Sequence, residues 1–129
     1  MIVKSPILKN RVRKIPKSFS WIDHRLVRGR YIESCSHTEA ALYLFLVCVA
    51  DNKGLSYYGD KALMDKLSMD IQTLQTARSG LIKHSLIAYR TPIYQVLCLE
   101  PVNNVHRSGS GMSLGEILTT AMEVTNDRL

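Results

Sequence analysis

Residues 55–99 read LSYYGDKALMDKLSMDIQTLQTARSGLIKHSLIAYRTPIYQVLCL, and the order of patterns in this stretch predicts the fold of the chain. A short β-type run at 55–58 comes first. Two helical segments follow, at about 60–67 and 70–84, with a break of about three residues around Ser68. That spacing is typical of a helix-turn-helix.

The second of these helices is amphipathic, because Leu74, Ala77 and Leu81 recur at i, i+3 and i+7. Two β-type runs follow it, at 86–89 and 93–99, with a short proline-containing connection between them. Runs of this kind, so closely joined, predict an antiparallel hairpin.

The clearest helix start in the chain lies before this stretch. Ser36-His37-Thr38-Glu39 has the S-x-x-E pattern of a capping box and predicts a helix over about 37–51. From Ala40 to Val49 this helix has almost no polar face, so we expect it, Cys48 included, to be buried on most sides. We also expect Cys98 to lie in the core.

A shorter helix is predicted over about 20–28. Ser20 is its expected N-cap, with an acid in the first turn. Trp21, Ile22 and Leu26 are expected to point inward.

The charge of the chain is concentrated at one end. The 129 residues carry a net charge of +6, and the apolar fraction of 46% is enough for one core. Residues 1–30 hold nine Lys or Arg and one acid, Asp23, so this segment carries +8 and the remainder −2. Such a surplus favours an anionic partner.

Four segments follow from these patterns. Residues 1–18 are a basic arm, either a disordered tail or a segment that lies along phosphates. Residues 19–101 form the domain, and 102–112 are a linker rich in Ser, Gly and Asn. Residues 113–129 contain a predicted amphipathic helix, which either folds back on its own core or forms a homodimer contact.

The stretch from 62 to 87 resembles the winged-helix family of bacterial regulators and of plasmid or phage replication initiators. The whole chain is also similar to small helix-turn-helix proteins of bacterial mobile elements. In the family a glycine ends the first helix of the pair, and another precedes the Leu-Ile that enters the wing. Here Ser68 and Ser85 stand at those two positions. The residues that carry the resemblance are Ala62-Leu63-Met64-Asp65-Lys66-Leu67-Ser68-Met69, Thr73-Leu74, Ala77, Leu81 and Leu86-Ile87.

The resemblance implies an α+β fold, a winged helix-turn-helix with a helical core and a small antiparallel β-wing. It also implies that the second helix is the recognition helix, which reads double-stranded DNA. The outward side of this helix has no acid between Ile71 and Lys83, whereas solvated faces usually mix Glu with Lys. Arg78 is expected at the boundary, with its head group free to reach guanine. The predicted DNA-binding residues are Gln72, Thr73, Gln75, Thr76, Arg78, Ser79 and Lys83 on the helix, Arg90 at the wing tip, and Arg11, Arg13, Lys14 and Lys17 in the arm.

Two functions from different classes remain open. The first is sequence-specific or structure-preferring binding of double-stranded DNA, as a transcription regulator or as a replication or mobile-element accessory. The second is a winged-helix protein-interaction module without direct DNA reading. A DNA-binding protein should present a continuous positive face that joins residues 1–30, Lys83 and Arg90, and a docking module should present an apolar patch there.

The sequence does not predict an enzyme, a cofactor or a metal site. Cys35 and His37 are two potential ligands without a second pair, which falls short of a structural zinc site. The three cysteines include no CxxC, which favours a reducing compartment. The longest apolar run, 40–50, is too short to cross a bilayer. We therefore expect a cytoplasmic, nucleoid-associated protein without membrane contact.

Overall fold

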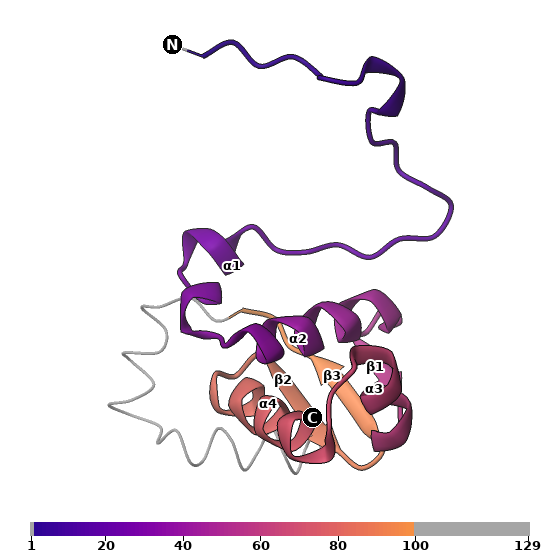
Figure 1. The fold of residues 1–129 in the computed structure, drawn as a ribbon, viewed down its shortest axis with the longest axis vertical. Helices are drawn as coiled ribbons and strands as arrows, with labels where there is room; N and C mark the ends of the chain where they lie inside the picture. The colour runs from indigo at the N-terminus through magenta and orange to yellow at the C-terminus, as the bar shows by residue number, and fades with distance from the viewer. Residues whose placement is uncertain (1, 100–129) are drawn as a thin grey trace.

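Helix α2, His37–Val49, lies between the basic arm and the helices Asp60–Leu67 and Ile71–Lys83 in the computed structural model, which describes residues 2–99 (Figure 1). Its capping box is confirmed. The Ser36 hydroxyl accepts the Glu39 amide at 3.1 Å, and the Glu39 carboxylate accepts the Ser36 amide at 3.0 Å. These two bonds satisfy backbone donors that a helix start leaves unpaired, so the local sequence suffices to begin α2 here.

The prediction that α2 is buried on most sides is wrong for one of its faces. Leu42, Leu46 and Val47 are buried, but Leu44 is 51% exposed and Cys48 is also exposed. Helix α2 packs against α4 (Ile71–Lys83) and β3 (Ile93–Val96), which covers one side of it. A helix that is apolar on all sides has no polar face to mark its exposed side, so only the packing shows which side faces solvent.

Helices α3, Asp60–Leu67, and α4 follow one another with the predicted break between them. Ser68 ends α3 in the left-handed conformation, with φ 55° and ψ 48°. Asp70 then begins α4, because its carboxylate accepts the Thr73 amide at 2.7 Å. The predicted apolar stripe is confirmed, since Leu74, Ala77 and Leu81 are all buried.

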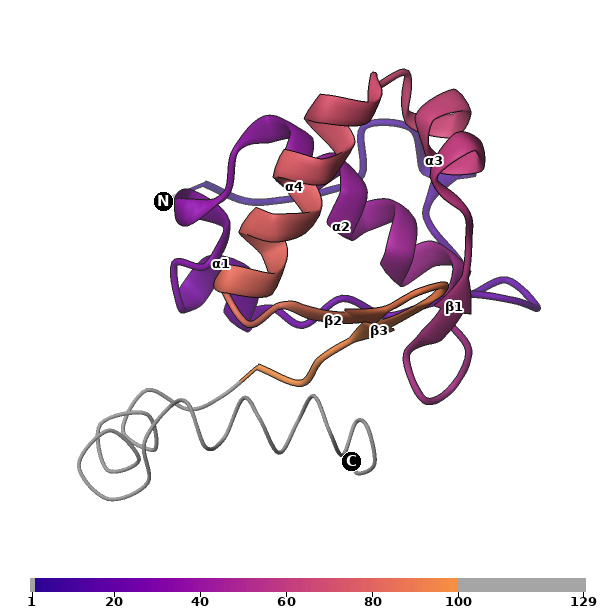
Figure 2. The same ribbon diagram turned by 90° about the horizontal axis from the view of Figure 1, so that it is seen from below.

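The predicted hairpin is also confirmed, and the first β-type run joins it. Strands β1 (Leu55–Tyr57), β2 (Ile87–Arg90) and β3 form an antiparallel sheet in the order β1-β3-β2. Figure 2 shows this sheet on one side of α2 and α4. Tyr94 on β3 is fully buried beneath the helices. The opposite face of the sheet carries the exposed Tyr57, which is paired with Ile93.

One core joins these elements into an α+β fold, which in the described part has four α-helices and three strands. The buried residues of this core are Leu26, Leu42, Leu46, Leu63, Leu74, Ala77, Leu81, Leu86, Ile87, Tyr94 and Leu99. Cys98 lies beside Leu99 but is exposed, so its predicted core position is wrong. In residues 2–99 no helix has both the length and the apolar character to cross a membrane. The predicted linker, the predicted C-terminal helix and its proposed dimer contact lie outside the described residues.

The prediction for residues 20–28 is largely wrong. Helix α1 is only Arg25–Arg28, and the Ser20 hydroxyl donates to the Val47 carbonyl at 2.7 Å instead of capping a helix. Trp21 is 74% exposed and Ile22 is exposed as well, whereas Leu26 is buried as expected. A tertiary hydrogen bond to α2 therefore engages the hydroxyl that was expected to cap a helix. Two short 3-10 turns, Lys9–Arg11 and Ile32–Ser34, complete the N-terminal part.

Candidate nucleic-acid interface

The outward face of α4 is polar and open. It lies opposite the buried stripe, and no acidic residue occurs between Ile71 and Lys83. Of the predicted contacts on this helix, Thr73 is half-buried. Five are exposed: Gln72, Gln75, Thr76, Ser79 and Lys83. The structure thus brings amide, hydroxyl and ammonium groups together on one surface that carries no carboxylate of its own.

Arg78 does not have the free head group that the sequence suggested. Its guanidinium Nη1 donates to Asp60 Oδ1 at 2.8 Å and to the Tyr94 hydroxyl at 2.8 Å. The guanidinium carbon lies 4.5 Å from the centroid of the Tyr89 ring. Only 12% of the side chain is exposed. Arg78 is therefore held inside the fold, and the prediction that it is free to read a base is wrong.

The contacts of Arg78 fix α4 against its neighbours. Asp60 is the first residue of α3, while Tyr94 and Tyr89 lie on β3 and β2. Burial alone would lower the pKa of Arg78, but the hydrogen bonds to Asp60 and Tyr94 raise it, so the charge is permanent. Desolvation by burial raises the pKa of Tyr94, which keeps its hydroxyl protonated. The sequence contains no spacing signal for this cluster, because its members come from four elements.

The β2–β3 hairpin presents a second set of exposed groups. Arg90 is exposed at the end of β2, next to the turn. It pairs with Ile93, which in turn pairs with Tyr57, so these three side chains form one row on the outer face of the sheet. Within the turn, the Thr91 hydroxyl donates to the Tyr89 hydroxyl at 3.2 Å.

The basic arm is separate from α4. Its predicted contacts, Arg11, Arg13, Lys14 and Lys17, are all exposed. Residues 2–18 extend away from the domain on the α2 side, whereas α4 lies beyond α2 (Figure 1). In this arrangement residues 2–18 do not form with α4 the one continuous positive face that was expected of a DNA-binding protein. The alternative signature, an apolar patch on α4, is absent from the described helix too.

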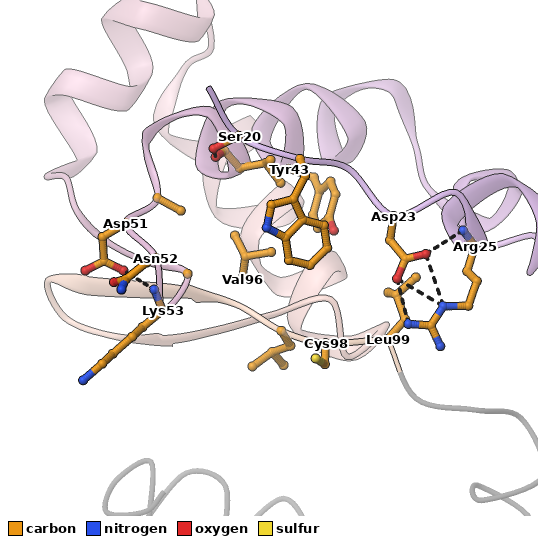
Figure 3. A pocket seen from close by; sticks show the side chains of 15 residues that line it. Ser20, Asp23, Arg25, Tyr43, Asp51, Asn52, Lys53, Val96, Cys98 and Leu99 are labelled. Atoms are coloured by element: carbon orange, nitrogen blue, oxygen red, sulfur yellow. Dashed lines mark hydrogen bonds and ion pairs between the residues drawn. The ribbon is translucent and has the colours of Figure 1, made fainter. Parts of the chain in front are cut away.

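A hollow of about 240 Å³ lies elsewhere, between the segment before α1, the end of α2 and the end of β3 (Figure 3). Both carboxylates that line it, Asp23 and Asp51, already accept hydrogen bonds from neighbouring residues. Asp23 accepts three hydrogen bonds from the Arg25 side chain, which lower its pKa. The backbone amides of Leu55 and Lys53 lower the pKa of Asp51. Carboxylates with lowered pKa are poor proton carriers near neutral pH, so this hollow does not have the features of an acid–base site.

The cysteines and histidines form no recognisable site in the described part of the chain. Cys35 donates through Sγ to the Tyr31 carbonyl at 3.6 Å, and burial raises its pKa. Among residues 2–99, no group of three or more metal-ligating side chains comes together.

Comparisons with family models, with curated proteins and with solved structures found no match to this chain.

Proposed function

We propose that residues 19–99 form a winged helix-turn-helix and bind double-stranded DNA, with α4 in the major groove and the β2–β3 hairpin beside it as the wing. The element order supports this proposal, as does the backbone at the two positions where the family usually has glycine. Ser68 and Ser85 both have positive φ, 55° and 60°. Glycine adopts this conformation without the steric cost of a Cβ, which explains its use at such turns.

The observation that carries the proposal is the exposed, acid-free face of α4. A helix can approach DNA only where its surface does not repel phosphates, and hydroxyl, amide and ammonium groups are donors to phosphate and base edges. Lys83 on α4 and Arg90 on the wing supply positive charge, and both side chains are exposed. The arm would then contact phosphates separately. A protein of this kind acts on the bacterial nucleoid, as a regulator or as a replication or mobile-element accessory.

The test is duplex binding by the full chain, measured by fluorescence anisotropy at two salt concentrations. Gln75→Glu places a carboxylate on the α4 face and should weaken binding about tenfold or more, since like charges face each other. Asn52→Asp makes the same amide-to-carboxylate change in the exposed turn after α2 and should leave binding nearly unchanged. Equal losses in both variants, or no binding of any duplex in dilute buffer, would overturn the proposal.

A second candidate, a protein-interaction module, is favoured by a different surface. Large apolar side chains are exposed before and on α1 and α2, among them Trp21 at 74%, Val27 at 64% and Leu44 at 51%. Apolar exposure of this kind often marks a protein contact. Light scattering with the full chain tests self-association there. If the chain is dimeric, Leu44→Glu should shift it toward monomer, and a dimer unaffected by this change would exclude the α2 face.

A further inference from the structure

The chemistry left exposed on α4 is restricted. Gln72 and Gln75 provide the only side-chain amides of this helix, and Thr76 and Ser79, which follow them, provide exposed hydroxyls. A Gln amide presents one donor and one acceptor, which match N6 and N7 of adenine in the major groove. The methyl group of a threonine can contact the methyl group of thymine. Guanine, in contrast, offers two acceptors in that groove and is read chiefly by Arg or Lys.

The only guanidinium on α4 is withdrawn from this surface. Arg78 is bonded to Asp60 and Tyr94, each at 2.8 Å, and stacks over Tyr89. To reach a base it would have to break an ion pair and leave a buried tyrosine hydroxyl without its partner. Both losses are costly. The fold therefore keeps the guanidinium of Arg78, the group on α4 that is best suited to read guanine, away from the exposed face.

The remaining cation of α4 lies at its far end. Lys83 is the last residue of the helix, 11 residues after Gln72, which corresponds to about 16 Å along the axis. The major groove is about 12 Å wide, and helix-turn-helix proteins place the N-terminal part of the recognition helix on base edges. With Gln72 and Gln75 at the bases, Lys83 reaches the level of the phosphates. Asp70, at the other end, has one carboxylate oxygen engaged by the Thr73 amide.

From these three observations we infer that α4 selects A·T base pairs, through Gln72 and Gln75, and does not select G·C pairs. This inference rests on the proposed DNA binding and adds the class of target sequence. Lys83 adds affinity for any duplex, because a phosphate contact carries no sequence information.

The experiment is selection from a random duplex library by the full chain at physiological salt, followed by affinity measurement on the selected duplexes. Selected sites should contain adenine at the contacted positions. Replacing one such A·T pair by G·C should weaken binding about 5- to 150-fold, the range for loss of one bidentate contact.

Three variants assign the preference to residues. Gln75→Ala should remove the preference for adenine at one position and leave binding to the other positions intact. Gln75→Arg should change the selected base at that position from adenine to guanine. Lys83→Ala is the matched control on the same helix, and it should weaken binding evenly on matched and mismatched duplexes.

The outcomes distinguish a loss of the preference for A·T pairs from a loss of DNA binding itself. Selected sites rich in G·C, sites without any base preference, or an adenine preference that survives Gln75→Ala together with Gln72→Ala would overturn the inference while leaving DNA binding in place. Failure to bind any duplex at low salt would overturn both.

Discussion

Arg78 has a different role in the structure from the one that the sequence predicts. On a helical wheel it lies at the boundary between the buried stripe and the polar face of α4, and its chemistry suits guanine. In the fold it joins α3 to the sheet through Asp60 and Tyr94. We therefore expect its substitution to act first on stability.

Arg78→Ala should lower the free energy of unfolding by about 1–3 kcal/mol, because it leaves the buried Tyr94 hydroxyl unpaired. Urea denaturation measures this change. Adding Tyr94→Phe should recover part of the loss, since both partners of one hydrogen bond are then removed. An Arg78→Ala protein as stable as the wild type would contradict the assigned role.

Three carboxylates should make the fold sensitive to acid. Hydrogen bonds lower the pKa of Asp23, Asp51 and Asp70 below the ordinary value of 3.8, in Asp70 through Thr73. A lowered pKa in the folded state contributes stability above the unfolded pKa, and this stability is lost as pH falls through the folded pKa. Stability should therefore decrease as the pH falls below 3.8.

Asp70→Ser isolates one of these groups, because serine is also a good N-cap but does not titrate. Between about pH 5 and about pH 2.5, the variant should lose less stability than the wild type in urea titrations. Parallel curves for the two proteins would show that Asp70 makes no contribution to the acid sensitivity.

At the scale of elements, the turns that join the helices and strands depend on left-handed residues. Ser68 ends α3 with φ 55°, and Ser85 precedes β2 with φ 60°. A side chain in this region costs roughly 1–2 kcal/mol relative to the right-handed form, whereas glycine avoids the clash. Serine is tolerated here because the packing of α3, α4 and the sheet holds the backbone in place.

Ser68→Gly and Ser85→Gly should each raise the free energy of unfolding by about 0.5–1 kcal/mol, after allowance for the greater freedom of glycine in the unfolded chain. Ser79→Gly is the matched control, because Ser79 is exposed within α4 and glycine should there lower stability by about 0.5 kcal/mol. Thermal or urea unfolding measures these changes. A loss of stability in all three variants would show that the backbone conformation of Ser68 and Ser85 has no steric cost that glycine relieves.

Helices α2 and α4 approach closely at Gly80. A Cβ built on Gly80 would collide with the Glu39 carboxylate, the same group that completes the capping box of α2. Glycine at this position therefore lets one side chain cap α2 while α4 packs against it.

Gly80→Ala should not stabilise the wild type, because the gain in helix propensity is offset by the displaced cap, each about 1 kcal/mol. In a Glu39→Ala background the same change should stabilise by about 1 kcal/mol. A double-mutant cycle in urea measures this coupling, and equal effects in the two backgrounds would show that Gly80 and Glu39 are independent.

At the scale of the whole molecule, the basic arm and α4 lie on different sides of α2 (Figure 1). A duplex bound to α4 would therefore meet the arm only if the arm reaches around the domain. Residues 2–17 are long enough for this, since an extended chain spans about 3.3 Å per residue.

Deleting residues 2–17 should lower affinity for every duplex and flatten the dependence of log K on log salt by up to about 5, because six basic residues are lost. Binding at several salt concentrations gives this slope. Ile7→Ala, a neutral change at a side chain that is 95% exposed, is the control and should leave the slope unchanged. A deletion with an unaltered slope would show that the arm does not contact DNA.

Local signals predicted most of the fold. Three predicted features depend on residues that are close in the sequence, and such features can be recognised from the sequence alone. They are the capping box at Ser36, the stripe of Leu74, Ala77 and Leu81, and the paired β-type runs. The prediction failed at Ser20, where a hydrogen bond to Val47, 27 residues away, replaced the local cap. The exposed polar residues of α4 were predicted for the same reason as its stripe, because a helix that buries one face must expose the other.

Patterns along the chain were enough to predict where α2, α3, α4 and the strands begin, which side of α4 faces inward and where the charge lies. Only the folded structure shows that Arg78 is bonded to Asp60 and Tyr94, that one face of α2 is exposed to solvent, and that the arm lies apart from α4. The difference comes from the distance along the chain over which each kind of interaction acts. Periodicity and capping act over one or two helical turns, whereas the partner of a buried charge and the face of an apolar helix depend on residues brought together from distant parts of the chain.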